Sequence, residues 1–121
     1  MTLRPASVRN ETKGTALFSR GEVARRWRHR LVGLMGRRSL DEEYGLIIEP
    51  CESIHTFWMR IPIDVVFIDL ECNVVRVFAD VRPWRVRFGG WKADTVIEGP
   101  VGMIQRSRTS VGDRLRIEER S

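Results

Sequence analysis

Residues 64–81, DVVFIDLECNVVRVFADV, form the strongest β-hairpin pattern in this chain of 121 residues. After Asp64, residues 65–68 are a short apolar run that is rich in β-branched and aromatic side chains, as a buried strand requires. Residues 69–73 are mostly polar and end on Asn73, which tolerates the left-handed backbone of a tight turn. Residues 74–81 resume the apolar pattern. The sequence therefore predicts two antiparallel strands joined by this turn.

Further short β-prone segments lie on both sides of this hairpin. We expect strands at residues 15–18, 46–48, 54–59, 95–98 and 114–118. The segment 82–91 contains one proline and two glycines, which interrupt regular pairing, so we expect an ordered loop there.

The clearest helical pattern begins at Ser19. Ser19 and Glu22 have the spacing of a capping box, in which the two side chains bind backbone N–H groups at the start of a helix. Apolar residues then recur at helical spacing, at Val23, Trp27, Leu31, Leu34 and Met35. We expect Trp27 to face the core, because it lies in the middle of this stripe.

Together these patterns predict a β-rich α+β fold. We expect a compact single-domain sandwich or partly open barrel of about six or seven short strands, with one main amphipathic helix packed on it. Residues 1–13 have little apolar content and are expected to form a flexible tail, so the globular domain would span residues 14–121. A chain of this length buries roughly two-thirds of its unfolded surface and needs no metal or disulfide to fold.

The composition excludes several classes of protein. Apolar residues make up 42% of the chain and charged residues 31%, which is typical of a soluble globular domain. No apolar run approaches the roughly 20 residues of a membrane span, and residues 1–20 lack the apolar block of a secretory signal. We therefore expect a cytoplasmic protein. Cys51 and Cys72 are too few for a disulfide framework, so we expect both to be free thiols.

The chain is basic, with 21 Lys and Arg residues against 16 Asp and Glu residues and a net charge of +5 at pH 7. All of the basic residues except Lys13 and Lys92 are arginines, and many of them lie between residues 20 and 38. Such a charge attracts phosphate groups, anionic lipids or acidic partners. An arginine bias also follows from the base composition of a genome, so nucleic acid is one candidate partner among others.

From Arg30 onward the chain carries an ordered set of short motifs. They are Gly33-Leu34-Met35, Cys51 to Met59, Ile63 to Asp69, Pro83-Trp84, Val96-Ile97-Glu98, Gly102 and Gly112-Asp113. The set is similar to that of domain-of-unknown-function family 192 (DUF192). The resemblance implies a small, β-rich single domain, and it brings no activity with it.

His55 and Asp64 are the candidate catalytic residues. Histidine is the usual acid or base near neutral pH. Ser53 or Cys51 would supply the nucleophile of a small hydrolase, with Asp64 or Glu98 orienting the base. The alternatives are structural: a half-buried histidine bonded to backbone, and a carboxylate that accepts backbone amides of a turn. The chain has no Gly-x-Ser-x-Gly nucleophile elbow, so we favour a protein that is not an enzyme.

Cys51, His55 and Met59 are residue types that bind soft metals, but their spacing is unsuitable. On an extended strand, residues four apart are separated by about 13 Å. Two ligand atoms of one metal lie only about 4 Å apart. We therefore expect no metal site and no cofactor.

Residues 83–92, PWRVRFGGWK, interleave aromatic and basic side chains. Aromatic faces and guanidinium groups stack on nucleobases and sugars. We therefore expect a small ligand-binding domain, for a sugar-like or nucleobase-like ring, with a cleft lined by His55, Trp58, Trp84, Arg85 and Glu98. The alternatives are a nucleic-acid-binding module that uses this loop and the arginines of residues 20–38, and the small hydrolase around His55 and Asp64. The tryptophans of the loop would also suit a hairpin that caps the core.

Overall fold

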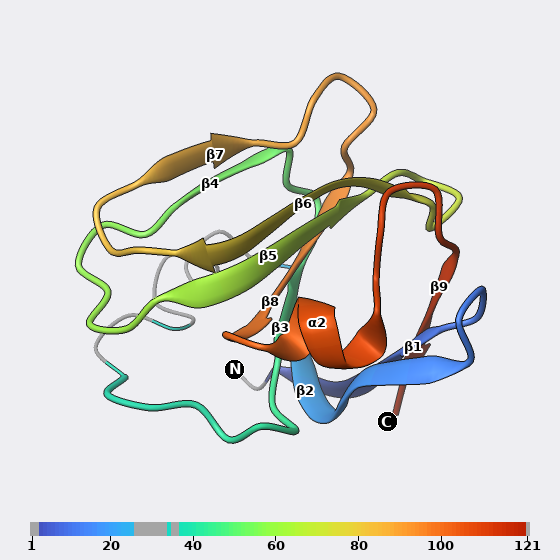
Figure 1. Ribbon diagram of the computed structural model, residues 1–121, viewed down its shortest axis with the longest axis horizontal. Helices are drawn as coiled ribbons and strands as arrows, with labels where there is room; N and C mark the ends of the chain where they lie inside the picture. Colours follow the sequence, from blue (N-terminus) through green and yellow to red (C-terminus); the bar gives the residue numbers. More distant parts are fainter. Residues whose placement is uncertain (1–2, 26–33, 35–36, 121) are drawn as a thin grey trace.

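The computed structural model describes residues 3–25, 34 and 37–120. This part of the chain forms short strands and one short helix (Figure 1). In order they are β1 (Arg4–Asn10), β2 (Thr15–Ala24), β3 (Leu46–Ile48), β4 (Ser53–His55), β5 (Ile63–Ile68), β6 (Val74–Val81), β7 (Val86–Phe88), β8 (Thr95–Pro100), α2 (Met103–Ser107) and β9 (Leu115–Glu119). None of the described helices is long and apolar enough to cross a membrane. Cys51 and Cys72 do not form a disulfide.

One curled sheet contains seven of the strands, in the order β6-β5-β8-β3-β2-β1-β9. β2 and β3 are parallel, and the other neighbouring pairs in this sheet are antiparallel. The two edges of the sheet meet at one end, where Asn73 and Arg114 form an antiparallel bridge. There the N–H of Val74 donates to the carbonyl of Asp113 at 2.8 Å. The sheet is therefore a half-barrel, which confirms the predicted β-rich single domain and partly open barrel.

The predicted hairpin at residues 64–81 is confirmed as β5 and β6. All residues of β5 are buried, because the strand lies inside the sheet between β6 and β8. Val66 and Ile68 pack in a cluster with Met103 of α2, whereas Val65 and Phe67 pack in a second cluster. A strand with both faces covered is a continuous apolar run rather than an alternating one.

β4 and β7 form a separate two-stranded layer beside β5 and β6 (Figure 1). In this layer Ile54 of β4 is opposite Arg87 of β7, and His55 is opposite Val86. The buried side chain of Ile54 belongs to the second apolar cluster, with Phe67. The layer therefore covers the face of the sheet opposite α2, and it occupies part of the segment 82–91 that was expected to be a loop.

The helix expected from Ser19 is wrong at its start, because residues 15–24 form strand β2. The Ser19 hydroxyl donates to Glu43 Oε1 at 2.7 Å, and Glu22 Oε1 accepts from the Tyr44 hydroxyl at 2.8 Å. Neither side chain caps a helix, since each binds a partner far away in the sequence. Of the later stripe residues, Leu34 is buried in the second apolar cluster, whereas Trp27, Leu31 and Met35 lie outside the described residues.

Residues 4–10, which were expected to belong to a flexible tail, form β1 between β2 and β9. Ala6 and Val8 are fully buried, whereas Arg4 and Arg9 are exposed. A strand with one buried face needs apolar side chains only at alternate positions. Two small apolar residues are therefore enough for β1, and the folded part of the chain begins before residue 14.

Candidate ligand-binding site

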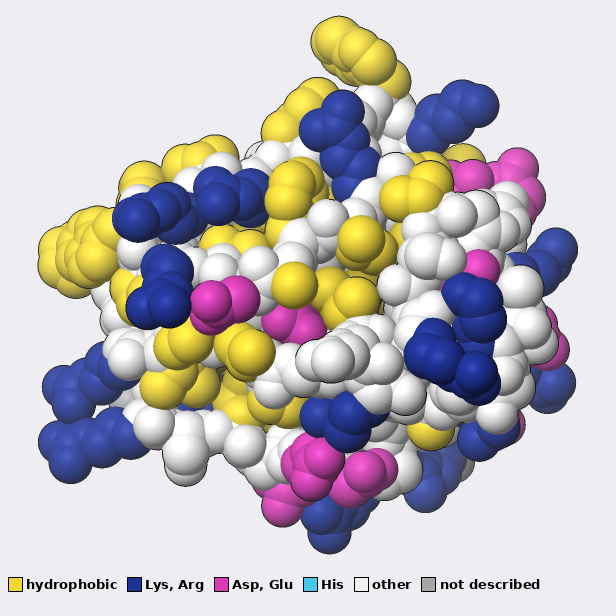
Figure 2. Space-filling view, in the orientation of Figure 1, with side chains coloured by type: hydrophobic (Ala, Val, Ile, Leu, Met, Phe, Trp, Pro, Cys, Tyr) yellow, Lys and Arg dark blue, Asp and Glu magenta, His cyan; other side chains and the backbone are white. Residues whose placement is uncertain are grey.

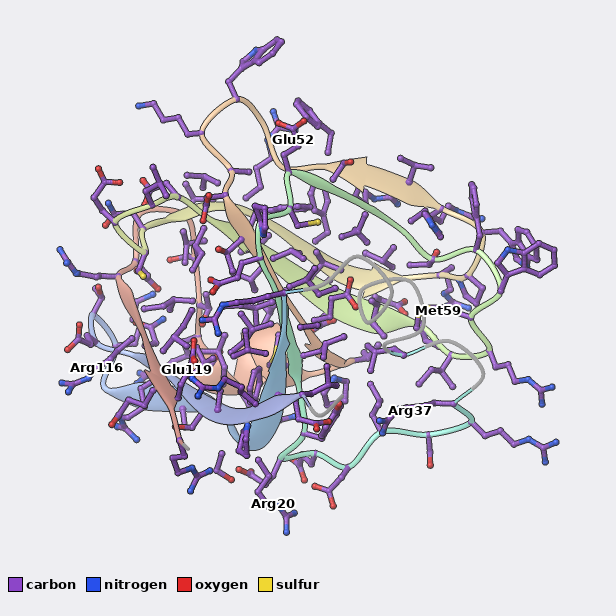
Figure 3. The ribbon with its side chains drawn as sticks, turned by 180° about the vertical axis from the view of Figure 1, so that it is seen from behind. Arg20, Arg37, Glu52, Met59, Arg116 and Glu119 are labelled. Carbon is purple, nitrogen blue, oxygen red and sulfur yellow. The ribbon has the colours of Figure 1, made fainter. Side chains whose placement is uncertain are left out.

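The β4–β7 layer is held on the sheet at both of its ends. Ile54 and Met59 are each 8% exposed and pack in the same cluster as Phe67. At the other end, Gly89 lies so close to the Phe67 ring that a Cβ atom would be 2.4 Å from it. Only glycine permits this approach. Figure 3 shows Met59 and Glu52 at opposite ends of the layer. Between the anchors Ile54 and Met59, His55 and Trp58 are exposed.

Four rings at the Met59 end of this layer form what we call the aromatic platform: His55, Phe57, Trp58 and Trp84. His55 stacks on Phe57 with centroids 4.8 Å apart, and Phe57 stacks on Trp84 at 5.6 Å. Trp58 meets Trp84 edge-on at 4.7 Å. Both arrangements are favourable for aromatic pairs. The structure thus brings together three predicted site residues and adds Phe57, which the sequence analysis passed over although it follows His55 by only two positions.

Thr56 joins the two turns that carry the platform. Its backbone N–H donates to the carbonyl of Arg85 at 2.9 Å, and its carbonyl accepts from the N–H of Trp84 at 3.1 Å. The Thr56 hydroxyl donates to the carbonyl of Arg82 at 2.7 Å and accepts from the N–H of Arg85 at 2.9 Å. Thr56 is fully buried, so these bonds are protected from water and fix the turns relative to each other.

The backbone at both tryptophans is left-handed, with φ of 69° at Trp58 and 66° at Trp84. Residues other than glycine, asparagine and aspartate rarely adopt this backbone conformation. Each residue that does so lowers the stability of the folded protein by about 1–3 kcal/mol. The surrounding hydrogen bonds to Thr56 offset this cost. The strained backbone holds both indoles on the outer side of the layer.

The platform is open to solvent, since the exposed fractions of Trp58 and Trp84 are 65% and 53%. Arg60, Arg82 and Arg85 are exposed beside these turns. Figure 2 shows hydrophobic side chains protruding at the left end of the β4–β7 layer, with dark-blue Lys and Arg side chains next to them. The predicted Arg85 is exposed and directly follows Trp84 in the chain, and the platform is an exposed surface with exposed arginines beside its turns.

Asp64 has a structural environment. It is 1% exposed and lies in β5. Its Oδ1 accepts from the N–H of Asp80 at 2.9 Å, and its Oδ2 accepts from the N–H groups of Gly102 at 3.1 Å and Ile104 at 3.0 Å. The carboxylate therefore joins β6 to the start of α2. Among the described contacts, none connects Asp64 with His55, so the structure does not bring together the pair suggested for a hydrolase.

Glu98 has no described contact with the rings of the platform. It is in β8, opposite Leu46 of β3 and Val65 of β5, on the sheet face that carries the second apolar cluster. Its exposed fraction is 6%, and burial raises the pKa of its carboxyl to about 7. The described ring contacts and hydrogen bonds of the platform do not include Glu98.

Tyr44 lies near Glu98 and was missed by the sequence analysis. Its hydroxyl donates to Glu22, and Arg37 Cζ lies 4.6 Å above its ring. Burial, together with the carboxylates of Glu22 and Glu98, raises the pKa of Tyr44 to about 12. Tyr44 is the only tyrosine of the chain. No local sequence motif marks it, because Glu22 and Glu98 come from the distant strands β2 and β8.

The described residues contain no group of three or more His, Cys, Asp or Glu side chains arranged to hold a metal ion. Cys51, His55 and Met59 also differ in environment, since Met59 is buried in the apolar cluster and His55 is exposed. An open depression elsewhere on the molecule is lined by Arg25, Glu49, Pro50 and Asp94. None of the predicted site residues lines it.

Comparisons with known proteins place the sequence in one family. The DUF192 family model, described as "Uncharacterized ACR", matches residues 8–117. A UPF0127 protein of Pyrococcus abyssi is 38% identical over 112 residues, covering 88% of this chain and 92% of that protein. One of Pyrococcus horikoshii is 33% identical over 113 residues, covering 88% and 95%.

The fold is also similar to a crystal structure of a protein of unknown function from Novosphingobium aromaticivorans. That similarity has a TM-score of 0.80 and a sequence identity of 26%, and it covers 93% of this chain and 83% of that one. The family match, which spans almost all strands of the half-barrel, confirms the resemblance seen in the motifs. The chain therefore belongs to the DUF192 family, whose function is uncharacterised.

Proposed function

We propose that this domain binds a nucleotide-like ligand on the aromatic platform. The main support is the exposure of two tryptophans in a strained, hydrogen-bonded arrangement. Large apolar side chains of this kind are normally buried unless they meet a partner. Trp58 and Trp84 instead protrude, although Thr56 between the two turns is fully buried. The platform is therefore rigid at its base and open at its ring faces.

The charge around the rings favours an anionic ligand. Arg60 and Arg85 are exposed beside the platform, and Arg82 forms a surface ion pair with Asp80 at 3.4 Å. A surface pair of this kind contributes about 0–1 kcal/mol and exchanges readily for another anion. A nucleobase stacked on an aromatic ring contributes about 1–3 kcal/mol. A ring and a phosphate together match the platform and the arginines beside its turns better than a neutral sugar does.

His55 adds a polar group at the edge of the platform. The backbone N–H of Phe57 donates to His55 Nδ1 at 3.3 Å. In the neutral imidazole the other nitrogen, Nε2, then carries the proton and is a hydrogen-bond donor. A nucleobase presents carbonyl and ring-nitrogen acceptors that such a donor can reach.

The hydrolase alternative has less support. Both oxygens of Asp64 already accept backbone N–H groups, so this carboxylate holds β6 and α2 and does not orient His55. The role that the contacts of Asp64 favour is structural. Binding without catalysis therefore remains the proposal for the platform.

Binding is tested by NMR titration of the indole N–H signals with adenosine monophosphate, adenosine and the neutral sugar maltotriose. We expect the nucleotide to shift the signals of Trp58 and Trp84, adenosine to shift them more weakly, and maltotriose to leave them unchanged. The double variant Trp84→Ala/Arg85→Ala should bind at least about tenfold more weakly and keep its stability within about 2 kcal/mol.

Trp91→Ala is the matched control, because Trp91 is 94% exposed and outside the platform. It should bind the mononucleotide as well as the parent protein does. If only maltotriose shifts the indole signals, the ligand of the platform is a sugar and not a nucleotide. The absence of shifts with all three compounds would overturn the proposal.

A further inference from the structure

Strand β7 is unusual because its apolar side chains face solvent. Val86 is 58% exposed and Phe88 is 41% exposed. Arg87, between them, points the other way and lies with its Cζ 5.7 Å from the centre of the Phe78 ring. In an ordinary covering strand the apolar side would face the core and the arginine would face water. The alternation of aromatic and basic residues therefore places an apolar stripe on the outside of the layer.

This stripe, defined as Trp84, Val86, Phe88 and Trp91, has an aromatic cluster at each end. The platform lies at the Trp84 end. At the other end the rings of Phe88 and Trp91 meet edge-on with centroids 6.1 Å apart. Figure 2 shows one group of hydrophobic side chains at the left end of the layer and another at the top of the molecule, with basic side chains between them.

The distance between the two clusters is too long for one nucleobase. Val86 and Phe88 are two residues apart on strand β7, which corresponds to about 7 Å along the strand, and Trp84 lies beyond Val86 in the preceding turn. A single ring that stacks on the platform cannot also contact the Phe88–Trp91 pair. A chain of linked nucleotides can place one base on each cluster.

Basic groups accompany both ends of the stripe. Arg85 is exposed next to Trp84. At the other end Arg76 donates to the carbonyl of Phe88 at 3.4 Å, and the exposed Lys92 follows Trp91. Glu52 is an exposed acidic residue at this end of the layer (Figure 3). The balance along the stripe is cationic, as it is for the whole chain with its net charge of +5, which suits a phosphate backbone.

We propose that the stripe binds single-stranded nucleic acid, with one base on the aromatic platform and another on the Phe88–Trp91 pair. This inference rests on the proposed function, because the platform must accept a nucleobase first. Single strands suit the site because their bases are free to stack, whereas the bases of a duplex are covered. Stacking on aromatic rings with arginine contacts to phosphate predicts binding with little sequence preference.

The experiment compares uridine monophosphate with a fluorescently labelled hexauridylate, by NMR for the monomer and by fluorescence anisotropy for the oligomer. We expect the oligomer to bind at least about tenfold more tightly than the monomer. Trp91→Ala should weaken binding of the oligomer about tenfold and leave binding of the monomer unchanged. Leu70→Ala is the matched control, because Leu70 is exposed outside the stripe, and it should change neither. Increasing salt should weaken binding of the oligomer.

The outcomes separate the two proposals. If the monomer binds but the oligomer is no tighter and Trp91→Ala has no effect, the extended site is wrong and the platform stands. If neither compound binds, both proposals are wrong. Trp91-dependent binding to vesicles of anionic lipid, without binding of the oligomer, would assign the stripe to a membrane surface instead. Far-ultraviolet circular dichroism of each variant checks that it folds.

Discussion

Thr56 and Arg85 exchange hydrogen bonds in both directions. The N–H of Thr56 donates to the carbonyl of Arg85, and the N–H of Arg85 donates to the hydroxyl of Thr56, each at 2.9 Å. These bonds join the turn after β4 to the turn before β7, 29 residues apart in the sequence. Because Trp58 and Trp84 lie on these turns, the contact sets the relative position of the two exposed indoles.

Thr56→Val should destabilise the protein by about 1–3 kcal/mol, because two partly buried backbone groups, the carbonyl of Arg82 and the N–H of Arg85, lose the hydroxyl to which they bind. Urea denaturation measures this loss. Thr56→Ser keeps the hydroxyl, so its free energy of unfolding should be much closer to that of the parent protein. Equal stability of the valine and serine variants would show that the hydroxyl does not hold the two turns.

Asp64→Asn should destabilise the protein by about 1–3 kcal/mol. The amide group of asparagine cannot accept at both positions, so at least one of the N–H groups of Asp80, Gly102 and Ile104 loses its partner. Asp80→Asn is the control, because it removes only an exposed ion pair to Arg82 and should cost less than about 1 kcal/mol. A thermal denaturation in which both variants melt alike would contradict the structural role of Asp64.

Asp113 should make the protein less stable in acid. Burial acts to raise its pKa, but hydrogen bonds from Asn10, Lys13 and the N–H of Ser110 outweigh burial and lower the pKa to about 2. The unfolded chain then binds more protons than the folded protein between about pH 4 and pH 2, so the free energy of unfolding falls as the pH drops through this range. Urea denaturation at several pH values should show this fall, and Asp113→Asn should show a smaller one.

Glu98 should have the opposite effect. Its carboxyl is buried, which raises its pKa from 4.5 to about 7. The folded protein therefore binds more protons than the unfolded chain between these values, and the free energy of unfolding should decrease as the pH rises from about 4.5 to about 7. Glu98→Gln, which does not titrate, should remove this dependence. A direct measurement is the ¹³C chemical shift of the Glu98 carboxyl during a pH titration. A midpoint near the ordinary value for glutamate would contradict the prediction.

The local sequence was sufficient to identify the hairpin of β5 and β6. Residues 65–68 are continuously apolar, residues 69–73 carry turn formers, and the two strands are neighbours in the sheet. By contrast, Ser19 and Glu22 have a spacing that also fits a helix cap. These residues form a strand because β2 pairs with β1 and β3. The residues of β3 lie more than 20 positions away, so a short stretch of sequence around Ser19 does not contain them. Long-range pairing therefore overrode the local pattern at β1 and β2.

The sequence by itself determined the kind of domain and the segments from which its exposed rings come. The aromatic residues of 55–58 and of 83–92 were apparent from residue type alone. The tertiary structure decided which of them meet: β4 pairs with β7, and the hydrogen bonds of Thr56 bring Trp58 to Trp84. It also placed Asp64 on the face of the sheet that α2 covers, away from that group, because successive side chains of a strand face opposite sides of a sheet. Contacts between residues far apart in the chain depend on strand register, and register is a property of the whole sheet.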